Sequence, residues 1–119
     1  MRDMTAGELA RELLDYFGPE GEHWLQGRLT NRLSGAQGKR CFHGAVAEIV
    51  LGRPQYASDT LGGLVAPFLV KVHEQYPQYP HETIRYPAIS RPMMEMESFN
   101  DLHPFGDLRV ILEKVAADE

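Results

Sequence analysis

Residues 41–51, Cys-Phe-His-Gly-Ala-Val-Ala-Glu-Ile-Val-Leu, form the most apolar run in the first half of the chain. Gly52 and Pro54 follow this run, in the order that is typical of a helix end. Gly44 lies inside the run, where glycine costs about 1 kcal/mol relative to alanine, so we expect another backbone to approach closely there. The apolar residues of the run recur at helical spacing and predict a helix over residues 41–51. They are Phe42, Ala45, Val46, Ile49 and Val50.

Three further helices are predicted on both sides of this run. Thr5 and Glu8 form a capping box that begins a helix over residues 5–17. The strongest apolar periodicity predicts a helix over residues 60–75, in two segments because Pro67 interrupts it. A last helix is predicted over residues 107–117, with Asp107 as its cap.

The segment between the first two helices has weaker signals. Residues 23–33 have mixed signals that fit a short strand or an extended segment, and residues 34–39 are rich in glycine and predict a surface loop or the tip of a loose hairpin. The fold class is therefore mainly α, with α+β as the alternative. At 119 residues, we expect one globular domain over residues 1–119, with about four helices.

Residues 76–98 differ from the rest because four prolines alternate with tyrosines. Proline at this density favours extended backbone, so we predict a long ordered loop. Such loops are often functional, and aromatic and methionine side chains are enriched at protein interfaces. The same composition also fits a loop that only covers the core. The candidate binding residues are Tyr76, Tyr79, Tyr86, Met93 and Met94.

The net charge of −5, from 12 basic and 17 acidic residues, argues against nucleic acid as a partner, because an acidic surface repels phosphate. A local patch is an alternative to this expectation, because several basic residues fall in one region together with Glu48. These basic residues are Arg28, Arg32, Lys39, Arg40 and Arg53.

The sequence also predicts a compartment. A single cysteine excludes an internal disulfide framework. The first residues contain no apolar segment of a signal peptide, and no run approaches the ~18 apolar residues needed to span a membrane. We therefore expect a protein of the reducing cytoplasm that has no membrane span.

Cys41 is the only cysteine, and it stands at the start of a predicted helix. Because a helix N-terminus stabilises a thiolate, Cys41 is a candidate nucleophile. A cysteine hydrolase would add a histidine and an orienting amide or carboxylate. The alternative is that Cys41 packs as a small buried hydrophobe. The catalytic candidates are Cys41, His43, His103, Asn100 and Asp101, with His73 and His81 as further histidines.

No metal or cofactor site is predicted. The histidines are not spaced as a pair on one helix face, and Cys41 and His43 lie roughly 200° apart around a helix of 3.6 residues per turn. Residues 35–38 lack the spacing of a phosphate-binding loop.

Three short motifs occur in order along the chain: Trp24-Leu-Gln26-Gly27, Cys41-Phe-His-Gly44-Ala45 and Phe99-Asn100-Asp101. Together they resemble a family of small actinobacterial and actinobacteriophage proteins of unknown function, over residues 5–117. Phe99 stands where that family usually has tryptophan. The resemblance implies no activity and no catalytic residue. It does imply that a phage-encoded member would act in the host cytoplasm on a host protein.

Three hypotheses about function remain from the sequence. The first is a non-enzymatic protein-binding factor, such as an inhibitor of a host protein, that uses the 76–98 segment. The second is a small hydrolase or transferase that uses Cys41 with a histidine and Asn100 or Asp101. The third is a structural homo-oligomer.

Overall fold

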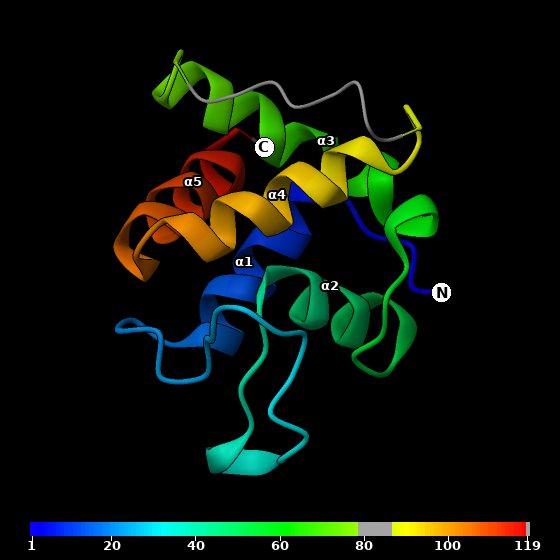
Figure 1. Cartoon of the computed structure of the whole chain (residues 1–119), viewed down its shortest axis with the longest axis vertical. Helices are drawn as coiled ribbons and strands as arrows, with labels where there is room; N and C mark the ends of the chain where they lie inside the picture. The colour runs from blue at the N-terminus through cyan, green and yellow to red at the C-terminus, as the bar shows by residue number, and fades with distance from the viewer. Residues whose placement is uncertain (79–86, 119) are drawn as a thin grey trace.

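Five α-helices make up most of the part of the chain that the computed structural model describes, residues 1–78 and 87–118. The mainly α fold class is thereby confirmed. Helix α1 packs mainly against α5, and α3 against α4, while α2 packs against α1 and α4 on the lower side of the body (Figure 1). The helices are α1 (Ala6–Phe17), α2 (Phe42–Leu51), α3 (Ser58–Gln75), α4 (Arg91–Leu102) and α5 (Phe105–Ala117).

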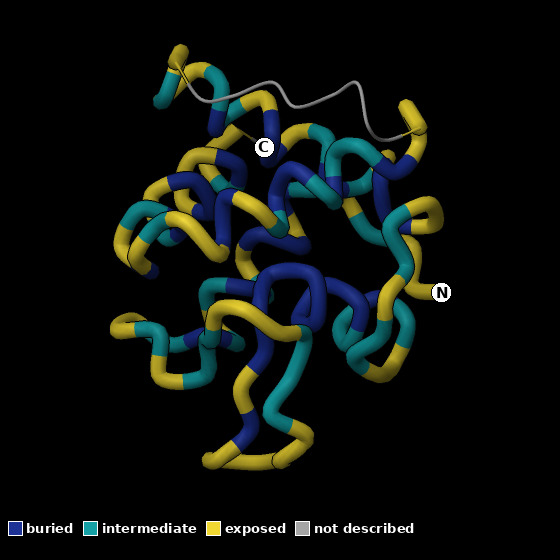
Figure 2. Tube along the Cα trace, in the orientation of Figure 1, coloured by how far each residue is buried: buried dark blue, intermediate teal, exposed yellow. Residues whose placement is uncertain are grey.

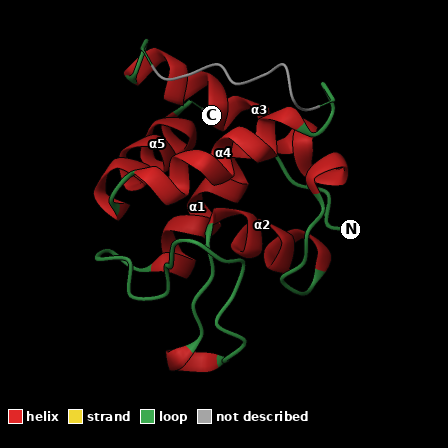
Figure 3. Cartoon of the chain, in the orientation of Figure 1, coloured by secondary structure: helices red, strands yellow, loops and turns green. Residues whose placement is uncertain are grey.

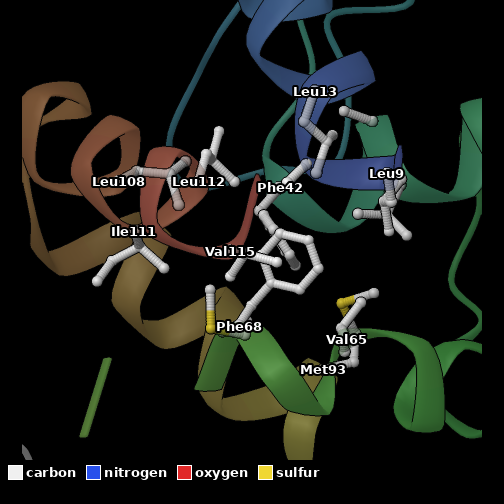
Figure 4. Packing of buried hydrophobic residues seen from close by; sticks show 14 of the residues in the cluster. Leu9, Leu13, Phe42, Val65, Phe68, Met93, Leu108, Ile111, Leu112 and Val115 are labelled. Atoms are coloured by element: carbon white, nitrogen blue, oxygen red, sulfur yellow. The ribbon is translucent and has the colours of Figure 1, made fainter. Parts of the chain in front are cut away.

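The core is a single apolar cluster to which all five helices contribute. Phe42 of α2 and Phe68 of α3 meet edge to face with ring centroids 5.4 Å apart, between side chains from α1 and α5 (Figure 4). Both phenylalanines are fully buried, and burial of one such side chain contributes about 1.5–3 kcal/mol. The apolar run that begins at Phe42 is therefore central to the packing, as the sequence indicates.

The predicted ends of the first two helices are confirmed. The Thr5 hydroxyl accepts a hydrogen bond from the Glu8 amide at 3.1 Å, and the Glu8 carboxylate accepts one from the Thr5 amide at 2.8 Å. Gly52 ends α2 in the left-handed region, at a φ of 98°, where a residue without a Cβ has no steric penalty.

The predicted loop over residues 76–98 is wrong in its last part, because α4 begins at Arg91. Pro92 stands in the first turn of this helix, where the missing N–H of proline has no intrahelical partner to lose. Met93 and Met96 are buried at helical spacing, so Met93 belongs to the core and not to an exposed surface. Tyr79 and Tyr86 lie outside the described residues.

Two helix predictions need smaller corrections. Helix α3 begins at Ser58 and continues through Pro67. The carbonyl that loses its partner belongs to Gly63, and because both residues are exposed, water can bind that carbonyl. Helix α5 begins at Phe105 after Pro104, so Asp107 lies in the first turn and is not the cap.

The connection between α1 and α2 contains no strand within the described residues, so the predicted short strand or hairpin is not confirmed (Figure 3). Arg40 forms isolated bridges with Trp24 and with Thr30. The connection leaves the helical body at the lower end of Figure 1 and turns back through the 3₁₀ turn η1 (Gly35–Gln37). We call residues 23–40 the basic loop.

None of the helices in the described part of the chain combines the length and the apolar character that a membrane crossing requires.

Gly44 provides a test of this packing. A Cβ at position 44 would overlap the carbonyl oxygen of Leu29 in the basic loop, whereas a Cβ at Gly63 on α3 would meet open space. We predict that Gly44→Ala lowers the free energy of unfolding by about 1–3 kcal/mol, because backbone must move. Gly63→Ala should leave it unchanged or raise it, because alanine favours helix. Urea unfolding of both variants measures the difference, and equal stabilities would refute the close approach.

Candidate functional site

The Asn100 side chain joins the three sequence motifs at one point. Asn100 is fully buried on α4, and its Oδ1 accepts hydrogen bonds from Trp24 Nε1 at 2.6 Å and from the Phe42 amide at 3.0 Å. Its Nδ2 donates to the Leu25 carbonyl at 3.1 Å and to Asp101 Oδ1 at 3.0 Å. Both Oδ1 partners can only donate, which fixes the orientation of the amide. The carboxamide therefore uses all its hydrogen-bonding positions to join the basic loop, α2 and α4.

Gln26 and Asp101 extend this junction at its surface. Gln26 Nε2 donates to the carbonyls of Asn100, Asp101 and His103, at 3.1, 3.3 and 2.8 Å. The Asp101 carboxylate accepts from the Gly27 amide at 2.9 Å. Since the last carbonyls of a helix have no intrahelical partner, Gln26 caps the C-terminus of α4 from the basic loop. These contacts give Gln26, Asn100 and Asp101 a positioning role.

Cys41 is buried at the N-terminus of α2, where its Sγ accepts a hydrogen bond from the Gly44 amide at 3.4 Å. Burial raises the pKa of the Cys41 thiol to about 11, against the smaller lowering effect of the Gly44 amide. Desolvation thus outweighs the stabilisation of a thiolate that the helix N-terminus offers. The thiol is protonated at neutral pH, and Asn100 has no free position with which to orient a catalytic histidine.

His43 is fully buried and connects three segments. Its Nε2 accepts a hydrogen bond from the Ala57 amide at 3.0 Å, and its Nδ1 lies 3.3 Å from the Glu97 carboxylate. Because an amide N–H only donates, Nε2 carries no proton, so in the neutral ring the proton lies on Nδ1. The exposed ring of Tyr56 meets His43 edge to face at 5.4 Å.

The remaining sequence candidates lie at the two ends of α4 and at the C-terminal end of α3. His103 Nδ1 lies 2.9 Å from the Asp107 carboxylate, and the His103 ring stacks on Phe99 at 4.2 Å. Tyr76 is partly buried against the core and meets His103 at 5.1 Å. Met94 is partly buried and accepts a hydrogen bond from the Ser58 hydroxyl.

The basic loop is held from inside by two polar residues that the sequence patterns did not single out for this role. The Asn31 Oδ1 accepts from the Leu33 and Lys39 amides, at 3.1 and 2.9 Å. The buried Arg40 guanidinium pairs with Glu48 at 2.8 Å and donates to the Leu33 carbonyl at 3.0 Å. These bonds fix the course of the loop although it lacks regular secondary structure.

A pocket of about 300 Å³ lies between this loop, α1 and α2. Its polar groups are largely paired with one another: Tyr16 donates to Glu48 at 3.2 Å, and His23 Nδ1 lies 2.9 Å from the Gly38 carbonyl. Burial, followed by the Glu48 charge, raises the pKa of Tyr16 to about 12. The pocket is lined by Tyr16, His23, Ser34, Gly35, Gly38, Arg40 and Glu48.

The exposed side of the basic loop is chemically different. Within the described residues, the side chains of Arg28, Arg32 and Lys39 make no ion pair or hydrogen bond. The loop has a largely exposed end (Figure 2). One sequence signal could have indicated this surface, because residues 23–47 contain no acidic residue. The exposed cations of the basic loop form the candidate functional surface.

The described part of the chain contains no group of three histidine, cysteine or carboxylate side chains that could hold a metal ion. Comparisons with protein-family models, curated proteins and solved structures find no match to this chain. The resemblance to actinobacteriophage proteins therefore stays a prediction, although its three motifs meet in space at Asn100.

The junction can be tested with a double-mutant cycle. We predict that both variants destabilise the fold: Asn100→Ala leaves the Phe42 amide and Trp24 Nε1 without their acceptor, at about 1–3 kcal/mol per group, and Trp24→Phe removes one of the two donors to Oδ1. Their effects should couple by about 1 kcal/mol, since the two side chains share one hydrogen bond. Because Trp24 is the only tryptophan, its fluorescence also reports the loss of the bond in Asn100→Ala. Additive effects and an unchanged emission spectrum would contradict the direct bond.

Cys41 reactivity is a second test. With a pKa of about 11 in place of 9.0, the thiolate fraction at pH 8 falls about 100-fold, and burial slows access further. We predict that DTNB labels native Cys41 at least 100-fold more slowly than the unfolded protein. Cys41→Ser combined with Ala36→Cys supplies an exposed reference thiol that should label fast. Rapid labelling of native Cys41 would instead favour a reactive cysteine.

Proposed function

We propose that the protein is a non-enzymatic protein-binding domain and that the basic loop is its contact surface. The observation that carries this proposal is that the inner side of the basic loop is hydrogen-bonded to the helices, whereas the cations on its outer side are exposed. Asn100 and Arg40 hold the loop from inside, whereas Arg28, Arg32 and Lys39 remain exposed without partners in the described structure. A loop that is already ordered loses less conformational entropy when it binds.

The length of the connection supports the proposal. Residues 18–41 separate α1 from α2 and contain only the short turn η1 as regular structure. Connections longer than about 12–15 residues without their own secondary structure are uncommon and are often functional. Leu33, near the turn, exposes 49% of its surface, so the loop also offers an apolar contact.

The contact surface differs from the segment that the sequence favoured. Met93 is buried, and Tyr76 packs against the core, so neither supports an exposed patch. The hydrolase hypothesis gains little support from a buried thiol with a raised pKa. The resemblance to actinobacteriophage proteins makes a protein of the host cytoplasm our proposed partner.

Site-specific photocrosslinking tests the proposal. A benzophenone amino acid replaces Ala36 at the exposed turn of the loop or, as the control, Glu113 on α5. In an actinobacterial lysate we expect adducts with a discrete partner from position 36 and none from position 113. Excess unlabelled wild type should suppress these adducts.

A charge-reversed competitor makes the result specific. The variant Arg28→Glu, Arg32→Glu, Lys39→Glu should fail to compete, because its carboxylates repel the anionic groups of a partner that the wild-type cations attract. The same adducts from both positions, or none from position 36, would contradict the proposal. Adducts between two copies of this chain would support the homo-oligomer instead.

A further inference from the structure

A groove of about 400 Å³ lies between the basic loop and the connection from α2 to α3. Arg28 and Arg32 of the basic loop line it, and Tyr56 lines it from the other segment. The groove thus combines two positively charged residues with one aromatic residue. Its lining residues are Arg28, Leu29, Thr30, Arg32 and Tyr56.

The two arginines differ from most cations of the helical body. Arg2 pairs with Glu12 at 2.7 Å, and Lys71 pairs with Asp118 at 2.7 Å. By contrast, neither Arg28 nor Arg32 has a side-chain partner among the residues that the structure describes. Their guanidinium groups are free to bind an anionic group in a bidentate manner.

Arg32 is also the only residue other than glycine with a positive φ, 65°, in the described ranges. The Thr30 hydroxyl accepts from its amide at 2.9 Å, and Asn31 holds the next amide, which fixes this conformation. Glycine or asparagine would adopt it with less strain. A strained backbone that carries an exposed, unpaired arginine indicates a role for the side chain.

Tyr56 is exposed over 70% of its surface, and its ring contacts the buried His43. Because Ala57 donates its amide hydrogen to His43, the backbone next to Tyr56 is anchored to α2. One part of the Tyr56 ring thereby packs on His43, while the rest of the ring is exposed to solvent. An apolar side chain of a ligand can pack there beside the two arginines.

We propose that this groove binds a short acidic peptide segment of the partner protein. Carboxylates pair with Arg28 and Arg32, and an apolar side chain between them packs on Tyr56. This inference rests on the proposed protein-binding function and names the chemistry of the partner.

The charge distribution favours a short peptide over a nucleic acid. Residues 23–58 contain five of the 12 basic residues and one of the 17 acidic residues. The rest of the chain therefore carries seven basic and sixteen acidic residues. A long polyanion would run from the groove onto this acidic surface and be repelled. A segment with a few carboxylates stays within the positive region.

Fluorescence anisotropy with a defined probe tests the groove. The probe is a fluorescein-labelled peptide of four glutamates around one phenylalanine, titrated with the full chain at low salt. We expect saturable binding that weakens at least tenfold in Arg28→Ala with Arg32→Ala. The matched control, Arg2→Gln with Lys114→Gln, removes the same charge outside the groove and should change the Kd less than twofold. Equal weakening by both double variants would overturn the proposal, as would no binding by wild type.

Two further variants separate the parts of the groove. Tyr56→Ala should weaken the phenylalanine peptide several-fold more than a peptide with glycine in its place. Arg32→Gly should raise the Tm while it weakens binding, because glycine relieves the positive φ. A loss of Tm in Arg32→Gly, or equal effects of Tyr56→Ala on both peptides, would contradict the assigned roles.

A single-stranded oligothymidylate of equal charge is the competing probe. Tighter binding of this oligonucleotide than of the peptide would overturn the proposal in favour of a phosphate ligand. Failure of the peptide together with successful crosslinking from position 36 would refute this inference alone, because the loop would then bind a partner of other chemistry. Failure of both experiments would refute the proposed function as well.

Discussion

The buried Asn100 carboxamide is the interaction on which the arrangement of the loop and the helices depends. It accepts from an indole on the basic loop and from the first amide of α2, and it donates to a loop carbonyl. Only a side-chain amide offers two donors and two acceptors on one rigid plane. Aspartate would lose both donors and bury a charge, and leucine would leave Trp24 and the Phe42 amide without partners. Because the Asn100 side chain is fully buried, each of these bonds is stronger than it would be in water.

This constraint explains how a long irregular connection keeps a defined course. Asn100 fixes the loop at residues 24 and 25, and the side chain of Gln26 attaches the loop to the end of α4. The absence of a Cβ at Gly44 lets the Leu29 carbonyl lie against α2. Beyond these anchors, Asn31 and Arg40 bind loop backbone to loop backbone. The buried polar groups of the loop therefore form the hydrogen bonds that hold it, and its other cations remain at the surface.

Regular apolar stripes made the helices at residues 5–17, 41–51 and 107–117 predictable, and the missing side chain at Gly44 correctly indicated a close approach. Helix α4 was missed because the density of prolines outweighed a weaker signal. Met93, Met96 and Asn100 do lie on one helical face, and Pro92 begins the helix that it was expected to prevent. A proline has opposite meanings in the first turn and in the interior, and the sequence alone did not distinguish them.

The candidate surface was harder to predict because residue type does not separate a structural cation from an available one. Arg32 and Arg40 are both arginines of the same loop, eight residues apart. Arg40 is buried against Glu48 and holds the loop carbonyls, whereas Arg32 is exposed in a strained conformation without a partner in the described structure. The difference arises from contacts between α2 and the loop that no local pattern encodes. Because Arg40 orders the loop from inside, the backbone positions of Arg28 and Arg32 are fixed while their side chains stay exposed, and this division of roles is the physical basis of the proposed binding surface.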